Sequence, residues 1–310
     1  MDLKRFEFDC DLTWYVFLLN ADETVYGRYG GRDATSADSR LSLTGLKYAM
    51  TKALEAHQQP PPKSITNPSE RVTPEMLAAG KGHKGCIHCH NIKEFERANA
   101  IRAGTWNRES LWVYPLPENV GLTLDVDIGN RVKSVAKDSA AALAGFKPGD
   151  FLNELNGVRI ASFADATYAL HKSPVKGTIT ATYERNNKPL TATLTVKDGW
   201  RKTNITWRPS MLELMPSLAF NGDDLSTAQK TKLGLDAKRA VFRQDAPVHK
   251  SLTAVGLLAG DVVIGFDGAV VEGTISDLLG HVRRNYLIGD TIKINVLRDS
   301  KPVELKLELR

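Results

Sequence analysis

The sequence is poor in cysteine and has no long apolar run. Three cysteines in 310 residues cannot form a disulfide framework, so stability must come from ordinary hydrophobic cores. No stretch approaches the roughly 18 to 20 consecutive apolar residues that span a bilayer. The first residues, 1–11, carry acids and lack the apolar core of a secretory signal. We therefore expect a globular chain without a transmembrane segment, periplasmic or otherwise extracytoplasmic if its true N-terminus carries a signal, and cytoplasmic otherwise.

Several catalytic motifs are also missing. The sequence contains no G-x-S-x-G string, no H-E-x-x-H string and no glycine-rich phosphate loop. Serine-protease, zinc-protease and nucleotide chemistry are thus unsupported. The 41 Lys and Arg residues exceed the 36 Asp and Glu residues by only five, and both signs are mixed along the chain. Dispersed charge of this kind is typical of solvated surfaces, so we expect no nucleic-acid partner.

An internal repeat is the clearest positive signal. The stretch AGFKPGDFLNELNGVRI (144–160) matches VGLLAGDVVIGFDGAVV (255–271) at three glycines and one aspartate. In each copy a Gly-Asp pair ends a tight turn and leads into a short apolar strand, which a second turn closes. Downstream, 184–196 and 297–309 each read as a hairpin of alternating strands. Two copies of one domain of about 80 to 100 residues are therefore predicted.

Each copy also contains a capped amphipathic helix between its strands. The segment 162–173 opens on Ser162, and the segment 274–285 opens on Thr274, both good N-cap residues. Strands that surround one helix in this way predict a small, partly open β-barrel capped by a helix.

The string A-G-F-K-P-G-D-F-L-x-x-L-N-G resembles the signature of bacterial PDZ domains, and its repetition indicates a tandem PDZ chain over 116–198 and 213–310. PDZ domains add an extended peptide C-terminus to a strand edge, and backbone N–H groups of a loop hold its carboxylate. The resemblance implies peptide or protein C-termini as partners. It places the loop residues and the histidines of the helices that border the grooves as follows: Val120, Gly121, Leu122 and His171 in the first domain, and Leu233, Gly234, Leu235 and His281 in the second. The first loop is the stronger candidate, because it precedes an alternating strand.

The N-terminal 57 residues have a different pattern. Two apolar strands, LTWYVFLLN and VYGRYGG, flank a turn and precede a helix within 37–58 that is expected to place Leu41, Leu43, Leu46, Met50 and Leu54 on one side. This stretch resembles the second half of the thioredoxin-like domain in bacterial thioredoxin-like plus PDZ proteins, a family that includes selenoproteins. The first half, which carries the redox dithiol in that family, is absent from this sequence.

A C-x-x-C-H string, in GHKGCIHCHN (82–91), lies between these regions. It follows a proline-rich break and opens a helix predicted to run to Gly104, within a linker region assigned to 58–115. Covalent haem c would use Cys86 and Cys89 for thioether bonds and His90 as proximal ligand. A Zn or Cu site would combine the two thiolates with imidazoles of His83, His88 or His90. A thiol–disulfide pair and an incidental motif are the remaining alternatives.

Together these features predict an α+β chain. It comprises a partial thioredoxin-like module (1–57), the helix-borne C-x-x-C-H linker (58–115), a first PDZ domain (116–198), a connector with Trp200 and Trp207 (199–212) and a second PDZ domain (213–310). The function expected is a non-catalytic PDZ scaffold that binds peptides or proteins and carries a haem or metal site. The alternatives are a thiol-redox (seleno)enzyme whose catalytic thioredoxin half lies outside this chain, and a plain peptide-binding adaptor.

Overall fold

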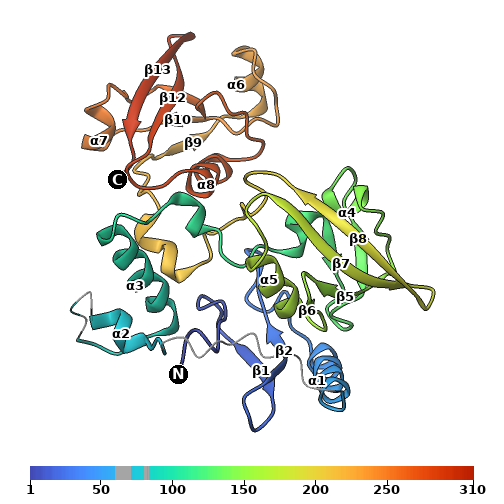
Figure 1. Cartoon of the computed structure of the whole chain (residues 1–310). Coiled ribbons are helices and arrows are strands. Elements are labelled where there is room, and N and C mark those ends of the chain that lie inside the picture. Colours follow the sequence, from blue (N-terminus) through green and yellow to red (C-terminus); the bar gives the residue numbers. More distant parts are fainter. Residues whose placement is uncertain (60–70, 80–81, 83) are drawn as a thin grey trace. The chain divides into compact units, whose positions relative to one another are not determined.

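The computed structural model describes residues 1–59, 71–79, 82 and 84–310. The chain divides into two compact units, Met1–Ser210 and Met211–Arg310 (Figure 1). His83 lies outside the described residues, so its predicted role as a ligand is not addressed by the structure.

The first unit begins with a hairpin and a helix in the predicted order. Strands β1 (Tyr15–Leu19) and β2 (Val25–Gly30) pair antiparallel, and helix α1 (Leu43–His57) follows. Ser42 caps this helix by accepting a hydrogen bond from the Gly45 amide at 2.8 Å. A two-stranded sheet with one helix is less than a thioredoxin fold, and the hairpin and helix belong to the same unit as the first PDZ domain.

The expected apolar side of α1 is not its buried side. Leu43, Met50 and Leu54 are exposed, whereas the buried positions are Gly45, Ala49 and Ala56. The reason is close approach: a Cβ atom built on Gly45 would lie 2.3 Å from the Val126 carbonyl oxygen. Small residues let this helix approach its neighbours, so the larger apolar residues are left on the opposite side.

Two further helices and two short 3-10 turns connect this region to the first PDZ domain. They are α2 (Pro74–Ala79), α3 (Cys89–Arg102), η1 (Arg108–Leu111) and η2 (Pro117–Val120). Helix α3 confirms the helix predicted after the C-x-x-C-H string. Gly104, just beyond its end, has a φ of +67°, a left-handed conformation that glycine adopts without steric cost.

The first repeat folds into the strands and helices of the first PDZ domain. Its elements in chain order are β3 (Leu122–Leu124), β4 (Val132–Val135), α4 (Ala140–Leu143), β5 (Phe151–Leu155), β6 (Val158–Arg159), α5 (Phe163–His171), β7 (Gly177–Arg185) and β8 (Lys188–Val196). β3 pairs with β4, and a four-stranded sheet has the order β6-β5-β7-β8. Its core includes Leu122, Leu152 and Leu170, which are fully buried, and the half-buried Trp200 packs against it.

The second unit contains the second repeat, preceded by η3 (Pro209–Leu214), which begins at the end of the first unit. The elements are β9 (Gly222–Asp224), α6 (Thr227–Lys232), β10 (Phe242–Gln244), α7 (Lys250–Thr253), β11 (Val262–Phe266), α8 (Ile275–Asn285), β12 (Thr291–Arg298) and β13 (Lys301–Glu308). The strands of this unit form one antiparallel sheet in the order β13-β12-β11-β10-β9. The core contains Phe242, Phe266 and Val282, all fully buried.

The aspartate of each repeated Gly-Asp pair forms the same ion pair. Arg185 Nε lies 2.7 Å from Asp150 Oδ1 in the first domain, and Arg298 Nε lies 2.8 Å from Asp261 Oδ1 in the second. Each guanidinium also donates to the carbonyl of the first repeated glycine, Gly145 or Gly256. The repeat therefore conserves a joint between the Gly-Asp turn and the last hairpin of each domain.

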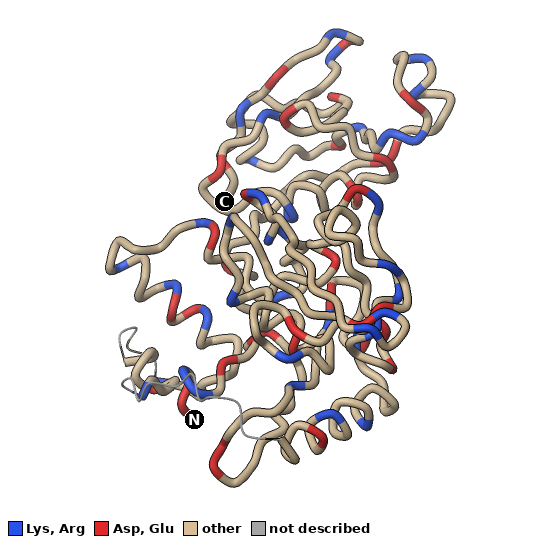
Figure 2. Tube along the Cα trace, turned by 45° about the vertical axis from the view of Figure 1, so that its right-hand side comes forward, with Lys and Arg blue, Asp and Glu red and all other residues tan. Residues whose placement is uncertain are grey.

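Charge is dispersed in both units. Figure 2 shows Lys and Arg interspersed with Asp and Glu along the chain trace. Within the described residues, no helix combines the length and apolarity that crossing a membrane requires.

Candidate functional site

The first PDZ domain has a strand edge suited to peptide addition. The Ala136 amide donates to the Gly121 carbonyl at 2.9 Å, so Gly121 faces β4. Because consecutive residues of an antiparallel strand face opposite edges, the N–H and C=O of Leu122 point to the other side, toward α5. The structure thus places Val120, Gly121 and Leu122 directly before and at the start of the groove strand β3.

Glycine is required at position 121 for two reasons. Its φ is +92°, which strains other residues, and a Cβ atom there would lie 2.0 Å from the Ser139 hydroxyl oxygen. Its amide donates to the Glu118 carbonyl at 3.0 Å, so this N–H is already used within the turn.

Helix α5, the other wall of this groove, is buried on all its faces. Seven of its nine residues are buried, including Phe163 and Thr167. In the second domain, by contrast, only Leu278 and Val282 are buried among the eleven residues of α8. The sequence of α5, FADATYALH, has almost no polar face, a pattern typical of a helix surrounded by protein.

The N-terminal hairpin covers α5. The Arg28 amide donates to Asp165 at 2.9 Å, the Ser162 hydroxyl donates to the Arg28 carbonyl at 2.5 Å, and the Arg28 guanidinium stacks 3.7 Å above the Tyr168 ring. Burial raises the pKa of Asp165 to about 6, although the charge of Arg28 and the surrounding donors oppose that shift. The predicted α5 is therefore confirmed as an element, but its outer surface is an internal contact.

His171 lies at the C-terminal end of α5 within this contact. Its ring stacks on Tyr114 with 4.3 Å between centroids, and its Nε2 lies 3.4 Å from Glu7 Oε1. Burial lowers the pKa of His171, while hydrogen bonding to Glu7 opposes that effect. Neutral His171 can accept from the Tyr114 amide through Nδ1 and donate to Glu7 through Nε2–H. Its contact with a peptide stays a prediction.

The second domain has an equivalent strand edge at a place the sequence analysis did not identify. The Asp245 amide donates to the Asn221 carbonyl at 3.1 Å, and the Leu225 amide donates to Val241 at 3.0 Å. This repeats the pattern of Gly121 and β3, so Asn221 occupies the position of Gly121 and Gly222 that of Leu122. The segment just before β9 is therefore the structural equivalent of the turn before β3. It could have been found by counting back from the paired strand β10 rather than by searching for glycine between leucines.

Leu233, Gly234 and Leu235 lie instead after α6, in the connection between β9 and β10. The two leucines pack partly against the small cluster of Leu225, Val241 and Val262. Gly234 has a φ of +68° where the helix ends. Their predicted role in carboxylate binding is untested, and the pairing of β9 favours Phe220, Asn221 and Gly222 for it.

Helix α8 retains an accessible apolar edge beside β9. Ile275 and Leu279, one turn apart, are only partly buried against the core, and the Ile275 amide donates to Asp224 at 2.7 Å across the end of the groove. His281 lies on the same helix, where Asn285 donates to its carbonyl at 2.8 Å. Burial lowers the pKa of His281, and the nearby charge of Arg284 adds to that effect. An extended peptide could thus meet both a strand edge and an apolar helix surface.

The C-x-x-C-H residues are gathered at the start of α3. Cys86 and Cys89 are exposed and form no disulfide bond, and His88 is the N-cap residue. The His88 and His90 rings are stacked with 5.8 Å between centroids. His90 Nδ1 lies 2.9 Å from Glu94 Oε1, one helical turn further on.

The start of α3 brings together the groups that covalent haem attachment uses, two thiols and an imidazole. Within residues 1–59, 71–79, 82 and 84–310, no three His, Cys, Asp or Glu side chains come together as a metal site. A haem would need only two exposed thiols and one imidazole. Metal-ligating histidines usually donate their other ring N–H to a carboxylate, and His90 Nδ1 has such a contact with Glu94.

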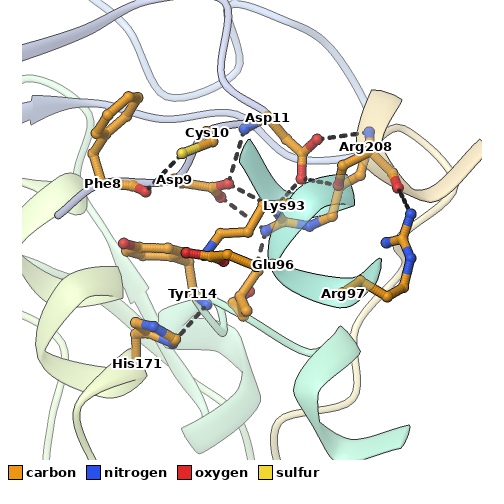
Figure 3. A network of polar contacts seen from close by, with 12 residues as sticks. Phe8, Asp9, Cys10, Asp11, Lys93, Glu96, Arg97, Tyr114, His171 and Arg208 are labelled. Carbon is orange, nitrogen blue, oxygen red and sulfur yellow. Dashed lines mark hydrogen bonds and ion pairs between the residues drawn. The ribbon is translucent and has the colours of Figure 1, made fainter. Parts of the chain in front are cut away.

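A buried ion network ties the N-terminus to the connector that follows the first PDZ domain (Figure 3). Arg208, 1% exposed, contacts Asp9 at 2.7 and 2.8 Å and Asp11 at 3.1 Å. Between these acids, Cys10 is buried, and burial raises the pKa of its thiol well above the usual range. The Cys10 thiol donates to the Phe8 carbonyl at 3.6 Å.

The fold and the two strand-edge grooves define a tandem peptide-groove protein. The profile of the PDZ domain matches residues 114–196 and 236–309, together just over half of the chain. The chain therefore belongs to the PDZ domain family, as its repeat predicted.

The relatives are periplasmic proteases. The periplasmic serine endoprotease DegP of Salmonella typhimurium is 28% identical over 144 residues, which cover 46% of this chain and 27% of DegP. DegP of Escherichia coli is 28% identical over 151 residues, covering 49% and 29%. The chain thus spans less than a third of the length of these relatives.

Similarity to solved structures is limited to part of the chain. The serine endoprotease from Yersinia pestis is 26% identical, with a TM-score of 0.22 and coverage of 24% of this chain and 27% of that one. The HtrA-type protease AlgW with decapeptide is 20% identical, with a TM-score of 0.27 and coverage of 43% and 42%. The match to the PDZ domain family supports the two repeats and does not extend to residues 1–57, so the thioredoxin-like resemblance of that region has no support.

Proposed function

We propose that this chain is a non-catalytic scaffold that binds free C-termini of peptides or proteins through its PDZ grooves. The observation that carries the proposal is the second groove, where the outer edge of β9 runs beside Ile275 and Leu279 of α8. Main-chain bonds to a strand edge supply affinity for any extended peptide, and an apolar pocket selects its side chains.

Peptide binding is tested on the full chain with fluorescein-labelled decapeptides that end in Val, Leu or Phe. Anisotropy should rise with peptides that have a free carboxylate and not with their amidated counterparts. Leu279→Lys should abolish binding at the second domain, because it places a charge on the apolar edge of the groove. Leu258→Lys is the matched control, since Leu258 is 47% exposed elsewhere in the same unit. Equal binding of free and amidated peptides would contradict the proposal.

We further propose that α3 carries a covalent haem, which Cys86 and Cys89 would hold by thioether bonds and His90 would bind through its imidazole. The haem would supply one-electron redox chemistry when bound. Glu94 would fix the orientation of His90 and hold the proton on Nδ1. The solvent exposure of both thiols supports access for the haem vinyl groups.

Haem is tested by mass spectrometry and acid-acetone extraction of protein from its native source. A mass increase of one haem and a Soret band that survives extraction are expected, because thioether links do not dissociate as axial bonds do. Cys86→Ser together with Cys89→Ser should remove both signals, whereas Cys10→Ser should leave them. Bound Zn or Cu without haem would favour the metal alternative instead. A haem-free, metal-free chain with a reversible Cys86–Cys89 disulfide would favour thiol-redox chemistry, and inert thiols would favour a plain adaptor.

A further inference from the structure

The groove of the first PDZ domain is crossed by a loop of the same chain. This cover loop, residues 31–42, joins β2 to α1. Its two ends are held together by Tyr29, whose hydroxyl donates to the Ser42 carbonyl at 2.7 Å and accepts from the Ser42 amide at 2.9 Å. The loop is therefore closed at its base by a buried side chain, since Tyr29 is 4% exposed.

The cover loop is fastened to the helix wall of the groove. A Cβ atom on Gly31 would lie 2.4 Å from the ring of Phe163, so the backbone passes directly against the first residue of α5. The Arg40 guanidinium lies 4.7 Å from the centroid of the same ring. Phe163 is consequently 9% exposed, although it stands at the mouth of the groove.

The same loop is fastened to both ends of the strand wall. Arg40 Nη1 lies 2.8 Å from Glu118 Oε1, in the turn that leads into β3. At the far end of β3, the Ser42 hydroxyl donates to Asp127 at 2.7 Å. Asp33 holds Arg40 in this position with contacts of 2.9 and 3.0 Å to its guanidinium. Tyr29, Arg40, Leu124 and Phe163 line one small hollow where the two walls meet.

We propose that the cover loop closes the first PDZ groove and that Arg40 is its latch. An extended peptide needs the edge of β3 and the groove face of α5, and the loop spans both walls. An external C-terminus therefore binds this domain only after Arg40 leaves Phe163 and Glu118. The inference rests on the proposed peptide binding and specifies its regulation: the second groove is available by default, whereas the first requires displacement of the loop.

Hydrogen exchange of the full chain tests the proposal without isolating either domain. The probe is the pool of labelled decapeptides with free C-termini that end in Val, Leu or Phe. In the unmodified chain the pool should slow exchange in 218–224 and 275–285 but not in 118–124 and 163–171. Arg40→Ala should extend the slowing to the first domain and strengthen binding there about tenfold, because it removes an ion pair and a cation–π contact together.

Two further variants make the result specific. Arg5→Ala is the matched control, because it removes the exposed Arg5–Glu23 pair in the same unit, and it should leave the first groove closed. Glu118→Gln keeps the shape of the latch but removes its charge partner, so it should open the groove in part. Slowing in both domains of the unmodified chain, or none in the first domain of both Arg40→Ala and Glu118→Gln, would overturn the latch. If the peptides slow exchange in the first domain of Arg40→Ala but not in the second domain of any variant, the proposed peptide binding by the second groove is contradicted, and the role of Arg40 as a latch is not.

Discussion

Arg208 Nη1 lies 2.7 Å from Asp9 Oδ1, although the two residues are 199 positions apart in the chain. The same guanidinium contacts Asp11 and donates to the Val113 carbonyl at 3.2 Å. Removal of one partner of a buried charge cluster leaves the others uncompensated. The segment before β1, the segment before the first PDZ domain and the connector after it are thus fixed to each other through one side chain.

Arg208→Met should destabilise the first unit by about 3 to 5 kcal/mol, because two buried carboxylates lose their counter-charge. The free energy of unfolding in urea measures this, with hydrogen exchange to assign the change to residues 1–210. Arg5→Ala, at a surface pair, should cost less than about 1 kcal/mol. A similar small cost for both variants would show that the cluster is not the joint that the geometry indicates.

The repeated Arg–Asp joints should act independently. Arg185→Ala should accelerate hydrogen exchange within 114–196, and Arg298→Ala should do so within 236–309. Each should cost about 1 to 3 kcal/mol, because the partner aspartate is buried and loses its charged donor. An effect of either variant in the other domain would contradict the independence of the two joints.

The repeat made the PDZ domains predictable, because its Gly-Asp turns, capped helices and hairpins are local features. The cover of α5 depends on contacts such as Arg28 with Asp165, 137 residues apart, which no local pattern encodes. One signal was nevertheless present: FADATYALH has almost no polar face, whereas ISDLLGHVRRN has a pronounced one. The segment before β9 escaped the sequence analysis for a different reason. Glycine is needed at position 121 because of Ser139, but Asn221 fills the equivalent position, so a search for glycine could not find it.

Stability of the first unit should fall in acid through Glu7. Burial would raise the pKa of Glu7, but hydrogen bonds from His171 and Lys172 and the charge of Lys172 lower it to about 2. The unfolded chain binds a proton near the ordinary pKa of 4.5, so the contribution is complete above that pH and is lost as the pH falls toward 2. The loss is of the order of 2 to 3 kcal/mol. Urea unfolding between pH 2 and 6 should show a shallower acid limb for Glu7→Gln, and an unchanged limb would contradict this role.

Replacement of Gly121 separates steric collision from backbone strain. Gly121→Ala combines a positive φ with a Cβ position 2.0 Å from the Ser139 hydroxyl, whereas Gly157→Ala has a φ of +77° and open space around the new atom. Gly157→Ala should therefore cost about 1 kcal/mol from strain alone. Gly121→Ala should cost at least about 2 kcal/mol and displace the turn that leads into β3, because Ser139 caps α4 and cannot move freely. Unfolding free energies and hydrogen exchange at 118–124 measure both effects. Equal costs for the two variants would show that Ser139 yields to the methyl group and that the turn tolerates a side chain.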